Sequence, residues 1–266
     1  MRTLIRFSLV VICAPLLCGA KLEITYVANE GFLLSDGTRK VLIDALFSGE
    51  DKPYGDFPSS ELVTRMEQAQ PPFRGLNLVL ATHPHDDHFS ARVVAQHLTN
   101  DKDAVFLSTS NAVEGVRRAS PELAGRTRSV CPAQMNSMRT EEAAGIRVEA
   151  FWVTHGRPDF ENLGYRLTFP GITALHLGDS RLDDWRSFKW DDAGIDVVFI
   201  NPGAFQRSME QGLEVAKGLM KARTVVLMHY KLGRDLEKTQ QLAARLQPHF
   251  RQVIVFTKPL ATRTTK

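Results

Sequence analysis

The chain has 266 residues, of which 43% are apolar and 24% are charged, with three cysteines and a formal net charge of +3. This length and composition exclude a small disulfide-stabilised protein, a disordered chain and a multi-span membrane protein. The charge is too small and too evenly spread for a nucleic-acid-binding face, so no nucleic-acid partner is expected.

The N-terminal segment has the pattern of a secretory signal peptide. Two arginines precede an apolar run over residues 7–18, and small residues follow it. The sequence predicts that residues 1–20 are a signal peptide cleaved after Ala20, so that the mature protein is exported to the periplasm or secreted. The run is interrupted by a proline and is shorter than the roughly 20 residues of a stable membrane span. A retained anchor, or lipidation at Cys18, is the alternative.

Residues 21–266 are predicted to form a single domain of two αβ halves. In the first half, apolar runs predict strands, and segments that follow a polar cap predict helices. Ser59 or Ser60 is the expected N-cap of the first helix, and Ser90 is that of the second. The expected strands cover 24–28, 31–34, 41–47, 76–81 and 104–107, and the expected helices cover 59–70, 91–97 and 111–118.

The second half shows the same alternation of strands and helices. Pro170-Gly171 predicts the turn of a hairpin between two apolar runs. The expected strands cover 146–154, 164–169, 172–177, 196–200, 224–228 and 253–256, and the expected helices cover 213–222 and 235–246. This alternation indicates layered α/β architecture.

The most specific pattern in the chain is a cluster of histidines. His83, His85, Asp87 and His88 match the spacing H-x-H-x-D-H. Imidazole nitrogens and carboxylate oxygens are ligands for zinc and similar divalent ions. The cluster follows the predicted strand 76–81, and α/β folds bind ligands at the carboxyl ends of strands. The pattern therefore predicts a metal site.

Three more candidate ligands follow predicted strands. His155 ends the strand 146–154, Asp179 follows 172–177, and His229 follows 224–228. Each alone is typical of a turn residue, but together with the histidine cluster they give seven candidate ligands at one rim of a sheet. Asp86 fits no ligand position and is interpreted as a solvated or helix-start carboxylate. His176 alternates to the opposite strand face and is expected to be a packed histidine.

The sequence resembles the metallo-β-lactamase superfamily of metal-dependent hydrolases over nearly the whole mature chain. The resemblance rests on residues 82–88, 154–155, 177–180 and 228–230, in the family's order. Residues 162–166 and 228–230 resemble the branch that includes ascorbate-6-phosphate lactonases. The resemblance implies an α/β fold, a four-layer αββα sandwich with metal ions at the rim between its halves.

The resemblance also implies a role for each candidate ligand. His83, His85 and His155 would hold one metal ion, Asp87, His88 and His229 a second, and Asp179 would bridge both. Two divalent ions are implied, zinc first and manganese or iron as alternatives. A metal-bridged hydroxide would cleave an ester, lactone or phosphodiester bond of a small molecule. Asp87 would act catalytically by orienting the hydroxide and passing a proton to the leaving group.

Several alternatives stay open from the sequence. Related ligand sets hold iron in oxygenases and redox proteins, and a non-catalytic metal-binding protein is a further possibility. β-Lactam hydrolysis is not expected, because the cysteine ligand of such relatives is missing between His155 and His229 and Cys131 is at no ligand position. Substrate, metal identity and oligomeric state are left undetermined. Possible substrate-binding residues, or ordinary surface residues, are Arg157, Asn201, Tyr230 and Lys231.

Overall fold

The computed structural model describes residues 20–50, 52–157 and 159–266. The predicted signal peptide lies outside these residues, except for Ala20, and it stays a prediction. Within the described residues, no helix is both long enough and apolar enough to cross a bilayer.

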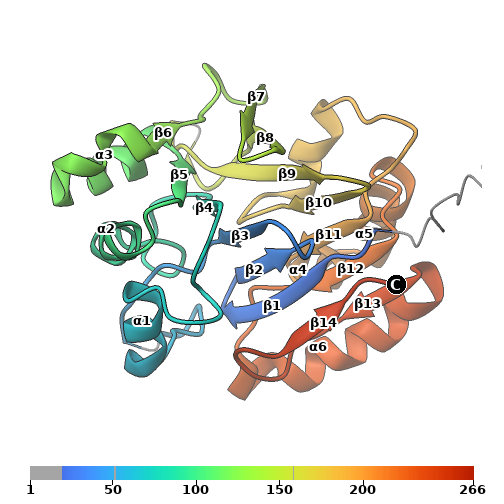
Figure 1. Ribbon diagram of the computed structural model, residues 1–266. Coiled ribbons are helices and arrows are strands. Elements are labelled where there is room, and N and C mark those ends of the chain that lie inside the picture. The colour runs from blue at the N-terminus through green and yellow to red at the C-terminus, as the bar shows by residue number, and fades with distance from the viewer. Residues whose placement is uncertain (1–19, 51, 158) are drawn as a thin grey trace, which may run out of the picture.

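Two seven-stranded mixed sheets form the centre of the molecule (Figure 1). The first sheet has the order β14 (Thr262–Thr264), β1 (Glu23–Ala28), β2 (Gly31–Ser35), β3 (Lys40–Ile43), β4 (Leu78–Leu80), β5 (Val105–Ser108) and β6 (Thr127–Ser129). The second has the order β13 (Gln252–Ile254), β12 (Thr224–Leu227), β11 (Val197–Ile200), β10 (Ile172–His176), β9 (Leu163–Phe169), β8 (Ile146–Trp152) and β7 (Met138–Ala143).

The two sheets share one pairing pattern. In the first, β14, β1, β2 and β3 pair antiparallel, and β4, β5 and β6 continue parallel to β3. In the second, β7, β8, β9 and β10 pair antiparallel, and β11, β12 and β13 continue parallel to β10. Strands at equivalent positions in the two sheets therefore have the same pairing direction, and their carboxyl ends lie at equivalent places.

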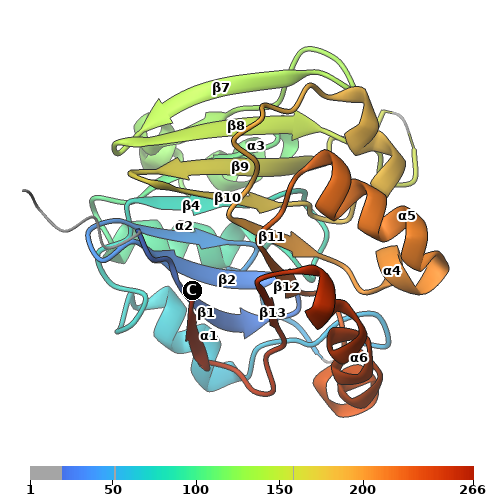
Figure 2. The same ribbon diagram turned by 90° about the vertical axis from the view of Figure 1, so that its right-hand side faces the viewer.

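Helices cover the outer face of each sheet (Figures 1 and 2). The first sheet carries α1 (Ser60–Glu67), α2 (Ala91–Asn100) and α3 (Ser110–Ala119), and the second carries α4 (Gly203–Arg207), α5 (Met209–Leu213), a π-helical continuation (Glu214–Leu219) and α6 (Leu232–Leu246). Short 3₁₀ turns occur at Pro121–Arg126, Leu182–Ser187 and Gln247–His249. The order helices, sheet, sheet, helices confirms the expected four-layer αββα sandwich.

Strand β3 shows how the layers are built from the sequence. Val41 and Ile43 join the apolar core between the sheets, which includes Tyr165 of β9. Leu42 points the other way, into the core shared with Leu62 of α1. Successive side chains of a strand alternate between faces, so a strand buried on both faces must be apolar throughout. The continuous apolar runs of the sequence are explained by this double burial.

The structure corrects the predicted elements at several points. The sequence pattern misses β6, β7 and β14, all three of which are edge strands. Edge strands expose many of their side chains, so the apolar signal of a buried strand is lacking. The strand expected over 41–47 ends at Ile43, because Asp44 adopts a left-handed φ of 46°. The helix expected over 213–222 instead begins at Met209, where the Ser208 side chain accepts a hydrogen bond from Gln211 N.

Helix α1 allows a direct test of its cap. The Ser59 side chain accepts a hydrogen bond from Leu62 N at 3.2 Å, which settles the choice between Ser59 and Ser60. We expect Ser59→Ala to lower the free energy of unfolding by about 1 kcal/mol. Ser60→Ala is the matched control and should change it by less than about 0.5 kcal/mol. Urea denaturation measures both, and equal effects of the two variants would contradict this assignment.

Candidate metal centre

Seven side chains from four segments converge where strands of both sheets end. The loop between β4 and α2 supplies four of them, and the segments that follow β8, β10 and β12 supply one each. Carboxyl ends of strands are the usual ligand-binding edge of α/β sheets. The structure brings together all seven residues that the sequence predicts as ligands, namely His83, His85, Asp87, His88, His155, Asp179 and His229.

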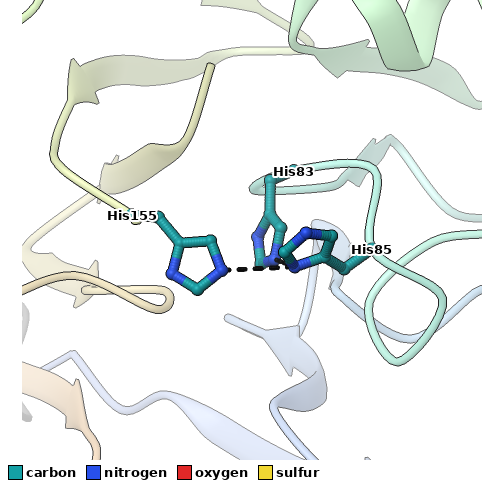
Figure 3. Close-up of side chains that lie close together, drawn as sticks. All are labelled: His83, His85 and His155. Carbon is teal, nitrogen blue, oxygen red and sulfur yellow. Dashed lines mark hydrogen bonds between the residues drawn. The ribbon is translucent and has the colours of Figure 1, made fainter. Parts of the chain in front are cut away.

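Three imidazoles form the first group at this rim. His83, His85 and His155 each offer a nitrogen within 4.8 Å of the others, and their rings point toward one another (Figure 3). His83 Nε2 lies 2.9 Å and His155 Nε2 lies 3.2 Å from His85 Nδ1. His155 Nδ1 lies 3.1 Å from the carbonyl oxygen of Asp179, which only accepts, so Nδ1 carries the proton and Nε2 is left for a metal ion. Such a set suits zinc.

The second group mixes imidazoles with a carboxylate. Asp87 Oδ2 lies 3.7 Å from His88 Nε2 and 3.8 Å from His229 Nε2. Tetrahedral ligands that are each about 2.1 Å from an ion lie about 3.4 Å apart, so these separations are close to those of a ligand shell. Asp87, His88 and His229 could therefore hold a metal ion.

Asp179 lies between the two groups. Its Oδ2 atom is 3.8 Å from His155 Nε2 and 3.7 Å from His88 Nε2, and its Oδ1 atom is 3.4 Å from His229 Nε2. Burial opposes its ionisation, but the contact with His88 and the charges of His88 and His229 hold the pKa of Asp179 well below its usual range. An ionised carboxylate that touches both groups fits the expected bridging position.

The donor atoms of this cluster fit a bound cation. His88 Nε2 is buried and has no hydrogen-bond partner within the described part of the chain. Burial, followed by the charge of His88, lowers the pKa of His83 well below its usual range, so its imidazole is neutral and able to coordinate. Buried polar atoms normally have partners, so an orphaned imidazole nitrogen among converging ligands is explained by a metal ion.

Asp44 contacts Thr82 and His88 on the side away from the ligand atom of His88. The sequence pattern does not identify this residue. Its carboxylate accepts hydrogen bonds from Thr82 N and Thr82 Oγ1, both at 2.7 Å, and lies 3.0 Å from His88 Nδ1. Because a carboxylate orients the imidazole that it contacts, Asp44 directs His88 Nε2 toward the metal centre. The available signal was an aspartate inside an otherwise apolar run.

The turn between β1 and β2 adds two polar residues that sequence reasoning also missed. Asn29 Nδ2 donates to Asp87 Oδ2 at 3.0 Å and so fixes the Asp87 carboxylate. Glu30 is fully buried beside His88 and Asp179. Burial, and then the neighbouring Asp179 carboxylate, raise the pKa of Glu30 well above its usual range. Both residues lie in a turn, where polar side chains are ordinary, so their role gave no local signal.

Two residues near the cluster behave as the sequence predicts. Asp86 points outward, where it forms an ion pair with Lys52 and accepts a hydrogen bond from Tyr54 Oη at 3.0 Å. His176 is packed against Phe199, and its Nε2 atom lies 3.0 Å from the backbone oxygen of Glu30. Neither side chain is a member of a ligand group found among the described residues.

The four residues that the sequence offers as possible substrate contacts have different environments in the structure. Tyr230 is buried and donates to the Phe256 carbonyl oxygen at 2.7 Å, and Lys231 Nζ donates to the Lys52 carbonyl oxygen at 2.7 Å, so both hold backbone segments together. Arg157 is exposed and lies 3.6 Å from Asp159. Asn201 lines a cavity next to the metal centre.

This cavity has a volume of about 620 Å³ and reaches His155, Asp179 and His229. Its size is within the range of small-molecule sites. Polar and charged residues from the segments after β10 and β11 form much of its wall, including Ser180, Arg181, Asp183, Asn201, Arg207 and Gln211. A small polar molecule could therefore reach both groups of ligands from this side.

Comparisons with known proteins agree with this geometry. The family described as "Beta-lactamase superfamily domain" matches residues 39–230. A UPF0173 metal-dependent hydrolase of Nitratidesulfovibrio vulgaris is 26% identical over 85% of this chain and 88% of its own length. A UPF0173 metal-dependent hydrolase of Pyrococcus furiosus is 24% identical over 78% of this chain and 84% of its own length.

A solved structure shows the same fold. Igni18, a metallo hydrolase of the archaeon Ignicoccus hospitalis, superimposes with a TM-score of 0.61 at 19% identity, over 92% of this chain and 99% of its own. The family match covers most of the chain and includes the histidine cluster, Asp179 and His229. The chain therefore belongs to the metallo-β-lactamase superfamily, as the metal-dependent hydrolases that it resembles do.

Proposed function

We propose that this protein is a dinuclear hydrolase that cleaves an ester, lactone or phosphodiester bond of a small molecule. The observation that carries the proposal is the pair of ligand groups joined by Asp179, which contacts His155 of one group and His88 and His229 of the other. Two bound divalent ions would supply a water of lowered pKa and polarise the oxygen of the scissile bond. We propose zinc, with manganese or iron as alternatives.

The residues around the ligands have separate tasks in this proposal. Asp87, held by Asn29, accepts a proton from the attacking water and passes it to the leaving group. Asp44 keeps His88 in one orientation. The 620 Å³ cavity receives the substrate beside His155 and His229. The resemblance to ascorbate-6-phosphate lactonases supports lactones as the first substrates to examine.

Metal removal and replacement test the proposal. We expect mass spectrometry of the purified protein to find two divalent ions per chain. Chelation should abolish hydrolysis of a panel of lactones, p-nitrophenyl esters and bis(p-nitrophenyl) phosphate, and added zinc or manganese should restore it. Because metal ions compete with protons for imidazole, reloading should weaken as the pH falls through the titration range of histidine.

Each alternative gives a different result in this experiment. Full hydrolysis after complete metal removal would contradict the metal-dependent mechanism. A single ion per chain in a fully active protein would contradict the dinuclear centre. Iron that gives a spin-resonance signal and an oxygen-dependent reaction would favour the oxygenase alternative, and full loading without turnover of any substrate would favour a binding protein.

A further inference from the structure

Glu30 is a buried glutamate beside the metal centre. It is not one of the seven ligands that the sequence pattern predicts. Its side chain is fully buried, and its Oε2 atom lies 3.9 Å from His88 Nδ1. Glu30, Asp179 and His229 each offer a ligand atom within 4.8 Å of the other two. Glu30, carried by the turn between β1 and β2, therefore lies beside Asp179 and His229 of the centre.

Both carboxylate oxygens of Glu30 are without a hydrogen-bond partner among the residues that the structure describes. The other buried carboxylates among the described residues differ in this respect, and Asp87 accepts a hydrogen bond from Asn29 Nδ2. Asp44 accepts two hydrogen bonds from Thr82, Asp101 accepts one from Leu76 N, and Glu149 forms ion pairs with Arg147 and Arg166. A buried carboxyl group without a partner is costly, so Glu30 requires a partner of another kind.

The neighbouring donors are already engaged elsewhere. His88 Nδ1 lies 3.0 Å from Asp44, closer than it lies to Glu30. His176 Nε2 lies 3.0 Å from the backbone oxygen of Glu30, so it does not serve the carboxylate. Asp179 offers only carboxylate oxygens, and its charge opposes ionisation of Glu30. A cation between the Glu30 and Asp179 carboxylates would satisfy both.

We propose that Glu30 is an additional ligand of the ion held by Asp87, His88 and His229, an inference that rests on the dinuclear centre proposed above. With Asp179, that ion has three carboxylates and two imidazoles, whereas the other ion has three imidazoles and one shared carboxylate. Oxygen ligands favour manganese and iron(II) relative to zinc. The two positions therefore differ in the metal ion that they prefer. The three-histidine position favours zinc, and the position that includes Glu30 favours manganese or iron(II).

The test compares Glu30→Gln with a matched control, Glu149→Gln. Both variants neutralise a buried glutamate, but Glu149 lies in ion pairs on β8, outside the ligand groups. We expect Glu30→Gln to weaken binding of the second ion by about 10- to 100-fold, the range found when groups that support a metal site are lost. Its manganese affinity should fall more than its zinc affinity. Glu149→Gln should bind both ions as the wild type does.

Thermal unfolding gives a readout that a purely structural role would not produce. Without metal, Glu30→Gln replaces an unpartnered buried carboxyl group by an amide of the same shape, so its Tm should be equal to or higher than the wild-type value. With saturating manganese, the wild type should have the higher Tm, because ligands that bind the folded state stabilise it by mass action. Glu149→Gln should have the lower Tm with and without metal, because it breaks a buried ion pair.

The outcomes separate this inference from the dinuclear proposal. If the wild type binds two ions and Glu30→Gln binds both within threefold of the wild-type affinities, the inference is wrong and the dinuclear centre stands. A metal-free Tm of Glu30→Gln below the wild-type value, with metal binding unchanged, also overturns it. A wild type that never binds a second ion overturns the dinuclear proposal itself. Glu30→Asp, which keeps the charge on a shorter side chain, should bind the second ion better than Glu30→Gln.

Discussion

Replacing Asp179 by asparagine is expected to lower hydrolysis by at least about a thousandfold, or about 4 kcal/mol in the activation barrier. The carboxylate lies within 3.8 Å of nitrogens from both ligand groups, so its charge serves two ions at once. An amide of the same shape keeps the packing but removes that charge. Metal content should fall below two ions per chain, and circular dichroism should show a folded protein.

His83→Ala should abolish hydrolysis in the same way, because it removes a nitrogen of the three-imidazole group. Asp192→Asn is the control for the aspartate change, since Asp192 is fully exposed and pairs with Lys221. Steady-state kinetics with the best substrate of the panel would compare the three variants. Hydrolysis that survives both Asp179→Asn and His83→Ala would show that these residues do not hold catalytic ions.

The second large effect is expected at Asp44. Asp44→Ala leaves Thr82 N, Thr82 Oγ1 and His88 Nδ1 without their buried partner, so we expect a loss of about 3–5 kcal/mol in the free energy of unfolding. Since His88 also loses the group that orients it, metal affinity should fall by about 10- to 100-fold. Urea denaturation and competition with a zinc-binding dye measure the two effects separately.

Asp44→Asn is the milder variant, because asparagine tolerates the left-handed φ of 46° and its oxygen can still accept from Thr82 N. Its loss of stability should lie between those of the wild type and Asp44→Ala. Asp101→Asn is the matched control, a buried aspartate that accepts from Leu76 N away from the ligand groups. A decrease in metal affinity for Asp101→Asn as large as for Asp44→Ala would show that the effect is not specific to the centre.

The sequence predicts the ligand cluster well, for two physical reasons. Four of the seven side chains lie close together in the chain, so their spacing alone reveals them. The others follow strands that are mostly buried and mainly apolar, which makes each strand end visible. His155, Asp179 and His229 could thus be placed at the rim before the fold was known.

Glu30 and Asp44 could not be found in this way. Each is a single acidic residue at the end of a short strand of the first sheet, and each reaches the centre only because β1 and β3 end beside the loop that carries the histidines. That proximity depends on long-range pairing, which leaves no periodic signal. The edge strands β7 and β14 were missed for a related reason, since solvent on one side relaxes the demand for apolar residues.

Strand β14 joins the last residues of the chain to the first described ones. Leu22 N donates to Thr265 Oγ1, and Thr265 N donates to Leu22 O, both at 3.0 Å. Glu23 pairs with Thr264 at the end of β1 away from Asn29, so the first described residues and the C-terminus lie about six strand residues, or roughly 20 Å, from the ligand rim. A tether at the C-terminus, such as an affinity tag or a bead, would hold the protein by the side away from the ligand rim and leave the metal centre open to the solution.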